Sequence, residues 1–171
     1  PDAARRALVD IEQAARDALV ELRQLLETLR TPVDDDPSDA STVGLEGLPA
    51  LVAHASENGL PTTLTIIGEP GPVAPTVQVN AFRIAQEALT NARRHGGPDA
   101  EADVRVRYLP DAVEVEIVTS GRPALTSQSG LGLLGMRERA VASGGSIEIS
   151  PRREGGFRVR LTVPRPEAVS A

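Results

Sequence analysis

The spacing of apolar residues predicts a long helix at the start of the chain. Over the first thirty residues they follow an unbroken 4-3 pattern, the a and d positions of a heptad: Ala4, Leu8, Ile11, Ala15, Ala18, Leu22, Leu25 and Leu29. Such a seam needs another helix to cover it, so we expect residues 1–31 to belong to an intermolecular bundle. The alternative is a helix that packs back on its own domain.

The residues after this helix have the composition of a hinge. Segment 32–43 is acidic and contains two prolines, which favours a flexible connection over packed structure. Segment 44–165 is expected to form one compact domain, followed by a short tail at 166–171.

The compact domain is predicted to contain three helices, with a strand between the first two. Residues 45–58 are expected to be helical and to stop at Gly59, residues 62–67 to form a strand, and a long helix to begin near residues 74–76. Another helix is predicted in the glycine-rich segment 130–140.

Strict alternation of apolar and polar residues predicts two β-hairpins, formed by 103–108 with 113–118 and by 146–150 with 157–163. The small and polar residues 121–129 between them read as a short mobile lid. The predicted fold class is therefore an α/β (α+β) two-layer sandwich, with helices on one face of a mixed sheet and a long helix before it.

Symmetric pairing of the first hairpin would set Arg107 against Glu114 and Arg105 against Glu116, which makes the outer face of the sheet polar. The apolar side chains of this hairpin are left for the core: Val104, Val106, Val113, Val115 and Ile117.

A polar stripe runs along the predicted long helix. As a helix, residues 82–97 place Arg83, Glu87, Asn91 and Arg94 on one face, beside an apolar row. Asn91 can supply a neutral oxygen ligand to magnesium that carries phosphates, and Glu87 can orient or deprotonate a nearby group. The alternative is a solvated helix face with i, i+4 ion pairs.

Three glycines crowd the start of the next predicted helix. Gly130, Gly132 and Gly135 allow the backbone to approach a ligand, and the free N–H groups of a helix start attract phosphate. Such a segment alone often marks only a mobile loop. Together with the polar stripe, it favours a site for a metal-bound triphosphate.

The motifs EALTNARRHG (87–96) and GLGLLGMRERA (130–140) resemble the catalytic domain of two-component sensor histidine kinases. More narrowly, they are similar to the nitrate-sensor-like subgroup of the GHKL superfamily, which has a Bergerat-type fold. The resemblance extends from residue 1 to about 164. It implies ATP and Mg²⁺ as cofactors, Glu87 and Asn91 as catalytic residues, and Asn91 as the metal ligand. It also implies a wider set of nucleotide contacts: Asn91, Arg94, His95, Thr119, Gly121, Gly130, Leu131, Gly132, Leu133 and Gly135.

One position departs from the pattern of that family. After this strand the family usually has Asp-x-Gly-x-Gly, whose Asp accepts a hydrogen bond from the adenine amino group, whereas this chain has Thr119-Ser120-Gly121-Arg122-Pro123. A threonine hydroxyl can still accept a hydrogen bond directly or through water, but it lacks the negative charge. The departure predicts weaker adenine selectivity.

Composition is consistent with this resemblance and argues against other classes. A formal net charge of -6 gives no general attraction to nucleic acid, and the absence of cysteine excludes disulfides and thiolate metal sites. No apolar run approaches the length that spans a bilayer. We expect a cytoplasmic chain whose parent reaches the membrane only through a missing N-terminal part.

The resemblance implies an ATP-dependent protein histidine kinase. It would donate the γ-phosphoryl of Mg-ATP to a histidine on the dimerisation bundle, for relay to the aspartate of a response regulator. The heptad helix would be the second helix of the dimerisation and phosphotransfer hairpin of a full-length homodimer. The only histidines, His54 and His95, lie outside the acceptor motif. We therefore do not expect this chain to autophosphorylate alone.

Three other functions are compatible with parts of the sequence. A degenerate, non-catalytic GHKL interaction module is suggested by Thr119 and Pro123. An anti-sigma-factor-type serine kinase shares the superfamily, but the heptad helix and GMRERA argue against it. A purely structural coiled-coil protein would not need the later hairpins and glycine segment.

Overall fold

The structure, a computed structural model, describes residues 43–122 and 130–165. These residues belong to one compact unit, Ser41–Ala171. The predicted bundle helix, nearly all of the hinge, residues 123–129 of the predicted lid and the tail at 166–171 lie outside the described residues, so what was predicted of them stays a prediction.

Five strands form one mixed sheet in the order β1-β2-β3-β5-β4. β1 (Thr62–Ile67) pairs parallel with β2 (Ala102–Tyr108), whereas β3 (Ala112–Thr119), β4 (Ser146–Pro151) and β5 (Phe157–Pro164) join through antiparallel ladders. The first predicted strand and both predicted hairpins are confirmed, with ends that differ by a residue at most.

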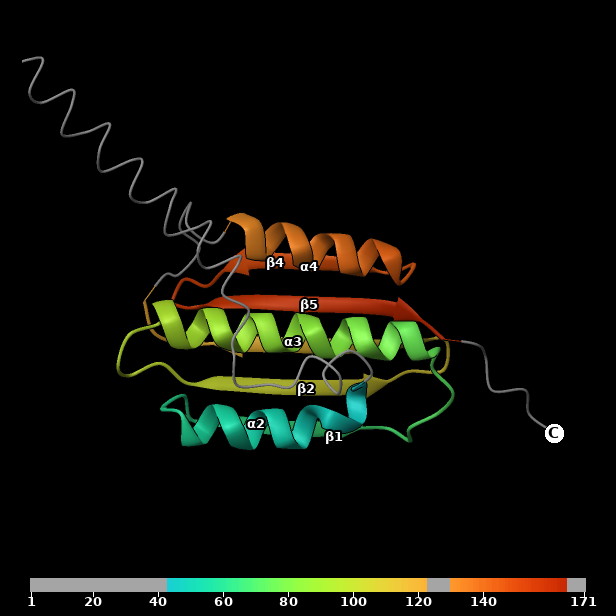
Figure 1. The fold of residues 1–171 in the computed structure, drawn as a ribbon, viewed down its shortest axis with the longest axis horizontal. Helices are drawn as coiled ribbons and strands as arrows, with labels where there is room; N and C mark the ends of the chain where they lie inside the picture. Colours follow the sequence, from blue (N-terminus) through green and yellow to red (C-terminus); the bar gives the residue numbers. More distant parts are fainter. Residues whose placement is uncertain (1–42, 123–129, 166–171) are drawn as a thin grey trace, which may run out of the picture. The chain divides into compact units, whose positions relative to one another are not determined.

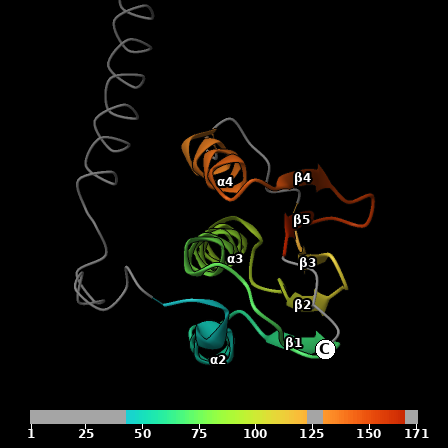
Figure 2. The same ribbon diagram turned by 90° about the vertical axis from the view of Figure 1, so that its right-hand side faces the viewer.

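The helices of the described residues lie on one face of this sheet (Figures 1 and 2). A 3-10 turn, η1 (Leu45–Gly47), leads into α2 (Leu48–Glu57), and α3 (Pro75–His95) and α4 (Gly130–Ala142) follow. Pro75 occupies the first turn of α3, where its missing N–H costs no helical hydrogen bond. The fold is the predicted α+β two-layer sandwich.

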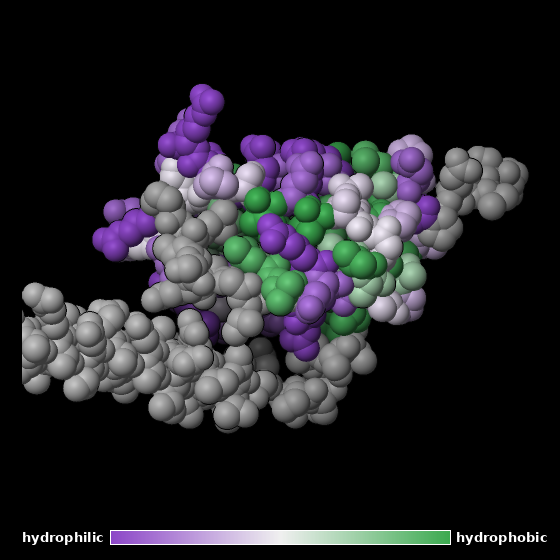
Figure 3. Space-filling model, turned by 90° about the horizontal axis from the view of Figure 1, so that it is seen from above, coloured by the Kyte–Doolittle hydropathy of each residue, from purple (hydrophilic) through white to green (hydrophobic). Residues whose placement is uncertain are grey.

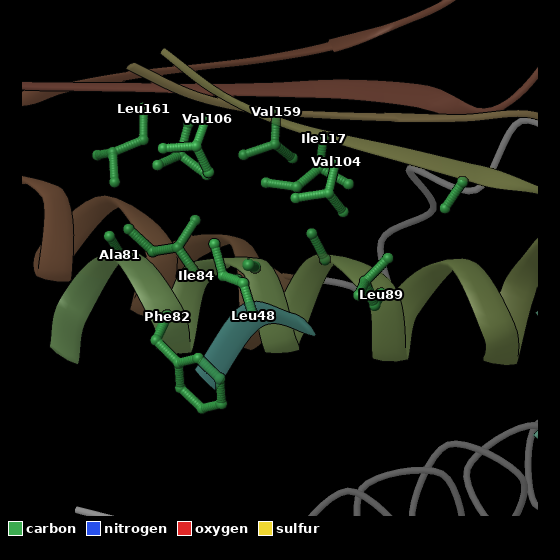
Figure 4. Packing of buried hydrophobic residues seen from close by; sticks show 14 of the residues in the cluster. Leu48, Ala81, Phe82, Ile84, Leu89, Val104, Val106, Ile117, Val159 and Leu161 are labelled. Atoms are coloured by element: carbon green, nitrogen blue, oxygen red, sulfur yellow. The ribbon is translucent and has the colours of Figure 1, made fainter. Parts of the chain in front are cut away.

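α3 supplies the centre of the core (Figure 4). Ala81, Ala85 and Ala88 are fully buried and let the helix approach the sheet closely, while Ile84 and Leu89 fill the space between. They pack with inward side chains of the central strands: Val104, Val106, Ile117, Val159 and Leu161. Each large side chain buried in this way contributes about 1.5–3 kcal/mol. All five core positions predicted for the first hairpin are buried: Val104, Val106, Val113, Val115 and Ile117.

The opposite face of the sheet carries charged side chains in the predicted register. Arg107 lies opposite Glu114 and Arg105 opposite Glu116. The ion pairs extend beyond this hairpin, because Arg160 of β5 donates to Glu116 at 2.9 Å, and this hydrogen bond raises the pKa of Arg160. Arg105 pairs within its own strand instead. The charges therefore connect three strands, and Glu116 is buried among them.

α4 is held by a narrow apolar contact. Met136 and Ala140 are fully buried, whereas Leu134 and Val141 are exposed on the other side of the helix. Seen from above, this side of the molecule shows hydrophobic and hydrophilic side chains intermixed rather than one apolar patch (Figure 3).

Candidate functional site

α3 and α4 bring the polar stripe and the glycine segment together, since the two helices pack side by side over the sheet (Figure 2). Gly132 lies directly against the side chains of Glu87 and Asn91. A methyl group added at Gly132 would overlap Glu87 Oε1 and would lie 3.4 Å from Asn91 Nδ2. The α4 backbone can approach α3 this closely because position 132 has no side chain.

Asn91 is a buried residue whose amide makes no hydrogen bond in the described part of the chain. It is 7 % exposed, and across residues 43–122 and 130–165 no group donates to its amide or accepts from it. Its amide oxygen and nitrogen are not among the fully buried unpaired atoms of these residues, so water, an ion or a ligand can reach them. Its neighbour Glu87 is half-buried one turn earlier on the same face.

An amide oxygen beside a carboxylate fits a hydrated magnesium ion that is also held by substrate phosphates. The residues that could hold such an ion here are Asn91 and Glu87. Within the described ranges there is no cluster of three or more His, Cys, Asp or Glu side chains able to bind a metal ion by itself. The donor set therefore suits a metal that arrives with an oxygen-rich ligand.

The basic end of α3 lies one turn beyond Asn91. Arg94 is exposed and His95 is half-buried, at i+3 and i+4 from Asn91. The helix ends where the sequence predicts: the Gly96 N–H donates to the Ala92 carbonyl at 2.8 Å. Cations in the last turn interact favourably with the helix dipole, and from there they can reach an anion beside Asn91.

Thr119 is the last residue of β3, and its hydroxyl group is hydrogen-bonded to the protein backbone. The residue is 1 % exposed, and its Oγ1 accepts the Phe157 N–H at 3.0 Å and donates to the Phe157 carbonyl at 3.4 Å. A hydroxyl has one donor and two acceptor lone pairs, so only one acceptor direction is left for a ligand. Thr119 therefore links the end of β3 to the start of β5, independently of any contact with a nucleotide.

Gly121 lies where two backbones meet. Its φ of 96° is left-handed, and a methyl group there would overlap the Gly96 carbonyl. The Arg122 N–H donates to the same carbonyl at 2.8 Å. The segment after β3 is thereby joined to the end of α3.

The glycine segment lies inside the first turns of α4, since the helix begins at Gly130 and includes position 131. Leu133 packs against the core. At Gly135 an added methyl group would meet the flexible end of Arg139, 2.9 Å from its Nη1. Gly132 is thus the glycine of this segment whose missing side chain leaves room for Glu87 and Asn91.

One residue near the end of β3 was not predicted from the sequence. Arg152 donates from Nη1 to the Thr119 carbonyl at 2.7 Å, so it holds the strand end in place. The two residues are far apart in the chain, and no local pattern links them. The sequence marks Arg152 only as part of a basic pair with Arg153.

Comparison with known proteins points to one family, described as histidine kinase-, DNA gyrase B-, and HSP90-like ATPase, which matches residues 76–167. The sensor histidine kinase LnrJ of Bacillus subtilis (strain 168) is 34 % identical over 149 residues, which are 86 % of this chain and 35 % of LnrJ. Sensor histidine kinase YxjM of the same organism is 33 % identical over 159 residues, 91 % of this chain and 38 % of YxjM. The chain thus spans little more than a third of these curated relatives.

A solved structure shares the fold. The ATP binding domain of PrrB from Mycobacterium tuberculosis matches with a TM-score of 0.53 and 21 % identity, over 73 % of this chain and 96 % of that domain. At this identity the likeness concerns the fold. None of the helices in the described part of the chain has the length and apolar character needed to cross a membrane.

Proposed function

We propose, for a chain that belongs to the family of histidine kinase-, DNA gyrase B-, and HSP90-like ATPases, that this domain binds Mg-ATP and donates its γ-phosphoryl group to a histidine. The acceptor histidine would stand on a dimerisation bundle, and a response-regulator aspartate would take the phosphoryl group from it. Support comes from the curated relatives, which are named sensor histidine kinases.

The observation that carries this proposal is the amide of Asn91 beside Gly132, which has no hydrogen bond within the described residues. Its oxygen and nitrogen are not fully enclosed, so a ligand can reach them. The neighbouring carboxylate of Glu87 makes an oxygen-seeking cation the natural partner. The start of α4 adds backbone N–H groups, which attract phosphate through the helix dipole.

The residues then divide the work of phosphoryl transfer, which rests mainly on positioning and on charge neutralisation. Asn91 holds the metal, and Glu87 orients the reacting group. Arg94 and His95 would flank the phosphates from the end of α3, and the free N–H groups at the glycine-rich start of α4 would face them. Magnesium, when bound, offsets the negative charge of the phosphates.

The role of the whole protein extends this proposal. The heptad pattern of residues 1–31 supports a homodimer formed through a helix bundle. The motif GMRERA supports membership of the nitrate-sensor-like subgroup. A response regulator would then be the partner that receives the phosphoryl group, and the reaction would take place in the cytoplasm.

A second candidate keeps the fold without catalysis. The observation that favours it is the hydroxyl of Thr119, which is bonded to the Phe157 backbone and carries no charge for the adenine amino group. In this case the domain is an interaction module with weakened nucleotide binding. A nucleotide titration without saturation would favour this candidate.

A phosphotransfer assay tests the kinase proposal. The chain is mixed with labelled Mg-ATP and with a separately supplied bundle that carries the acceptor histidine. We expect label on the histidine, and loss of labelling with Asn91→Ala or Asn91→Asp while the fold is retained. Unchanged transfer by both Asn91 variants would contradict the site assignment.

A further inference from the structure

A hollow of about 290 Å³ opens at the turn of the β4–β5 hairpin, lined by Ser150, Pro151, Arg152, Arg153, Glu154 and Arg158. Ser150 and Arg158 face each other in register, and they alternate with inward residues, so both point to the face of the sheet away from the helices. Three guanidinium groups therefore surround a space that can hold a small anion.

Two of these arginines are already anchored. Arg152 donates to the Thr119 carbonyl at 2.7 Å and to Glu154 at 3.4 Å, and Arg158 Nε lies 3.3 Å from Glu116. A guanidinium has five N–H donors, so these contacts leave donors for a ligand. Anchoring before binding lowers the entropy that a ligand must overcome to order the site.

Arg153 adds a charge that no ion-pair partner offsets within the described residues. It is exposed, and in the part of the chain that the structure describes it has no hydrogen-bond or ion-pair partner. The carboxylate of Glu154 lines the same hollow, but its side chain is 86 % exposed. Farther along the same face, Arg160 lies between Glu114 and Glu116, and Glu116 is shared with Arg158. The hollow therefore has an excess of positive charge in a chain whose net charge is -6.

Arg152 also lines a larger neighbouring hollow of about 570 Å³. Here Thr62, Thr63 and Ser120 already use their hydroxyl groups in hydrogen bonds within the protein. This second hollow is also lined by the carboxylates of Glu101 and Asp103, which disfavour an anion. The recognition of an anion is therefore concentrated at the hairpin.

We propose that the arginine hollow, formed by Arg152, Arg153 and Arg158, binds a doubly charged oxyanion such as the phosphate group of a small phosphomonoester. Phosphate oxygens accept several charge-assisted hydrogen bonds at once, and a dianion suits three guanidinium groups better than a single carboxylate does. The inference does not depend on the proposed kinase function, because these residues do not contribute to the place where Asn91 meets Gly132.

An NMR titration of the full chain with inorganic phosphate at about pH 7.5 and constant ionic strength tests the proposal, since the probe then carries mostly two charges. We expect saturable changes in the amide signals of residues 150–158. Arg153→Gln should weaken the affinity about fivefold, the effect of one exposed charge contact. Arg137→Gln, which removes another exposed arginine, from α4, should leave the affinity unchanged.

Three results would overturn the proposal. The first is the absence of saturable changes at residues 150–158, including the case in which phosphate perturbs only residues 87–95 and 130–135. The second is equal weakening by Arg153→Gln and Arg137→Gln, which would reflect net charge alone. The third is acetate binding as tightly as phosphate, which would show that the hollow does not distinguish one negative charge from two.

Discussion

Asn91 on α3 and Gly132 on α4 are neighbours: a methyl group on the glycine would stand in van der Waals contact with the amide nitrogen, at 3.4 Å. Within the described residues the amide has no hydrogen bond, and the glycine places no side chain over it. This pair links the polar stripe of one helix to the glycine-rich start of another. The predictions that follow ask what each partner contributes.

Replacing Asn91 should weaken ligand binding without lowering the free energy of unfolding. Asn91→Leu replaces an amide that has no hydrogen bond within the described residues by an apolar group of similar shape, so the free energy of unfolding should stay the same or rise. Asn80→Leu on the same helix removes a hydrogen bond of 3.0 Å to Ser143 Oγ and should cost about 1 kcal/mol. Urea unfolding of both variants measures the difference. A larger loss for Asn91→Leu than for Asn80→Leu would show that the amide is satisfied in the protein.

The two glycines of α4 should respond differently to alanine. Gly132→Ala displaces the carboxylate end of Glu87, which offsets the gain in helix propensity, so the free energy of unfolding should change by less than about 0.5 kcal/mol. Gly135→Ala meets only the movable end of Arg139 and should raise it by up to about 1 kcal/mol through helix propensity. Thermal unfolding followed by circular dichroism compares the two. Equal effects would mean that a side chain at position 132 does not displace Glu87.

Thr119 should matter for stability. Thr119→Val leaves the buried Phe157 N–H without its acceptor and should cost about 1–3 kcal/mol. Thr65→Val, at an exposed position of β1, serves as the control and should change the free energy of unfolding by less than about 0.5 kcal/mol. Chemical denaturation measures both. If Thr119→Val is as harmless as Thr65→Val, the hydroxyl does not hold the end of β3.

Glu46 should make a small, pH-dependent contribution. The Gly44 N–H donates to Glu46 Oε1 at 2.8 Å, and this hydrogen bond lowers the pKa of the carboxyl from its ordinary value of 4.5. A lowered pKa means stability that is present above the ordinary value and is lost as the pH falls through the lowered one. Glu46→Gln should therefore be slightly less stable than the parent at neutral pH and equal to it in acid. A difference independent of pH would contradict this.

The strands and helices could be predicted because each depends on a pattern of apolar and polar residues within a short stretch of the chain. Alternation over 103–108 and 113–118 identified the first hairpin, and the facing charges of Arg107 and Glu114 fixed its register. The stop of α3 followed from Gly96 and Gly97. Each of these predictions depends on residues close together in the chain.

The parts of the site that could not be predicted depend on contacts between distant segments. From the sequence alone, the three glycines near residue 130 could not be distinguished. The packing of α4 on α3 shows that Gly132 is the neighbour of Asn91. The bond between Thr119 and the Phe157 backbone likewise joins strands that are distant in the chain. Such contacts leave no periodic trace in a sequence.

Calorimetric titration with ATP, in the presence and absence of magnesium, tests the central claim most directly. We expect saturable, magnesium-dependent binding to the parent chain and to Asn80→Leu, and affinity lowered about tenfold or more in Asn91→Leu. Magnesium-dependent binding that is equally tight in Asn91→Leu would contradict the assignment of the metal and nucleotide site to Asn91.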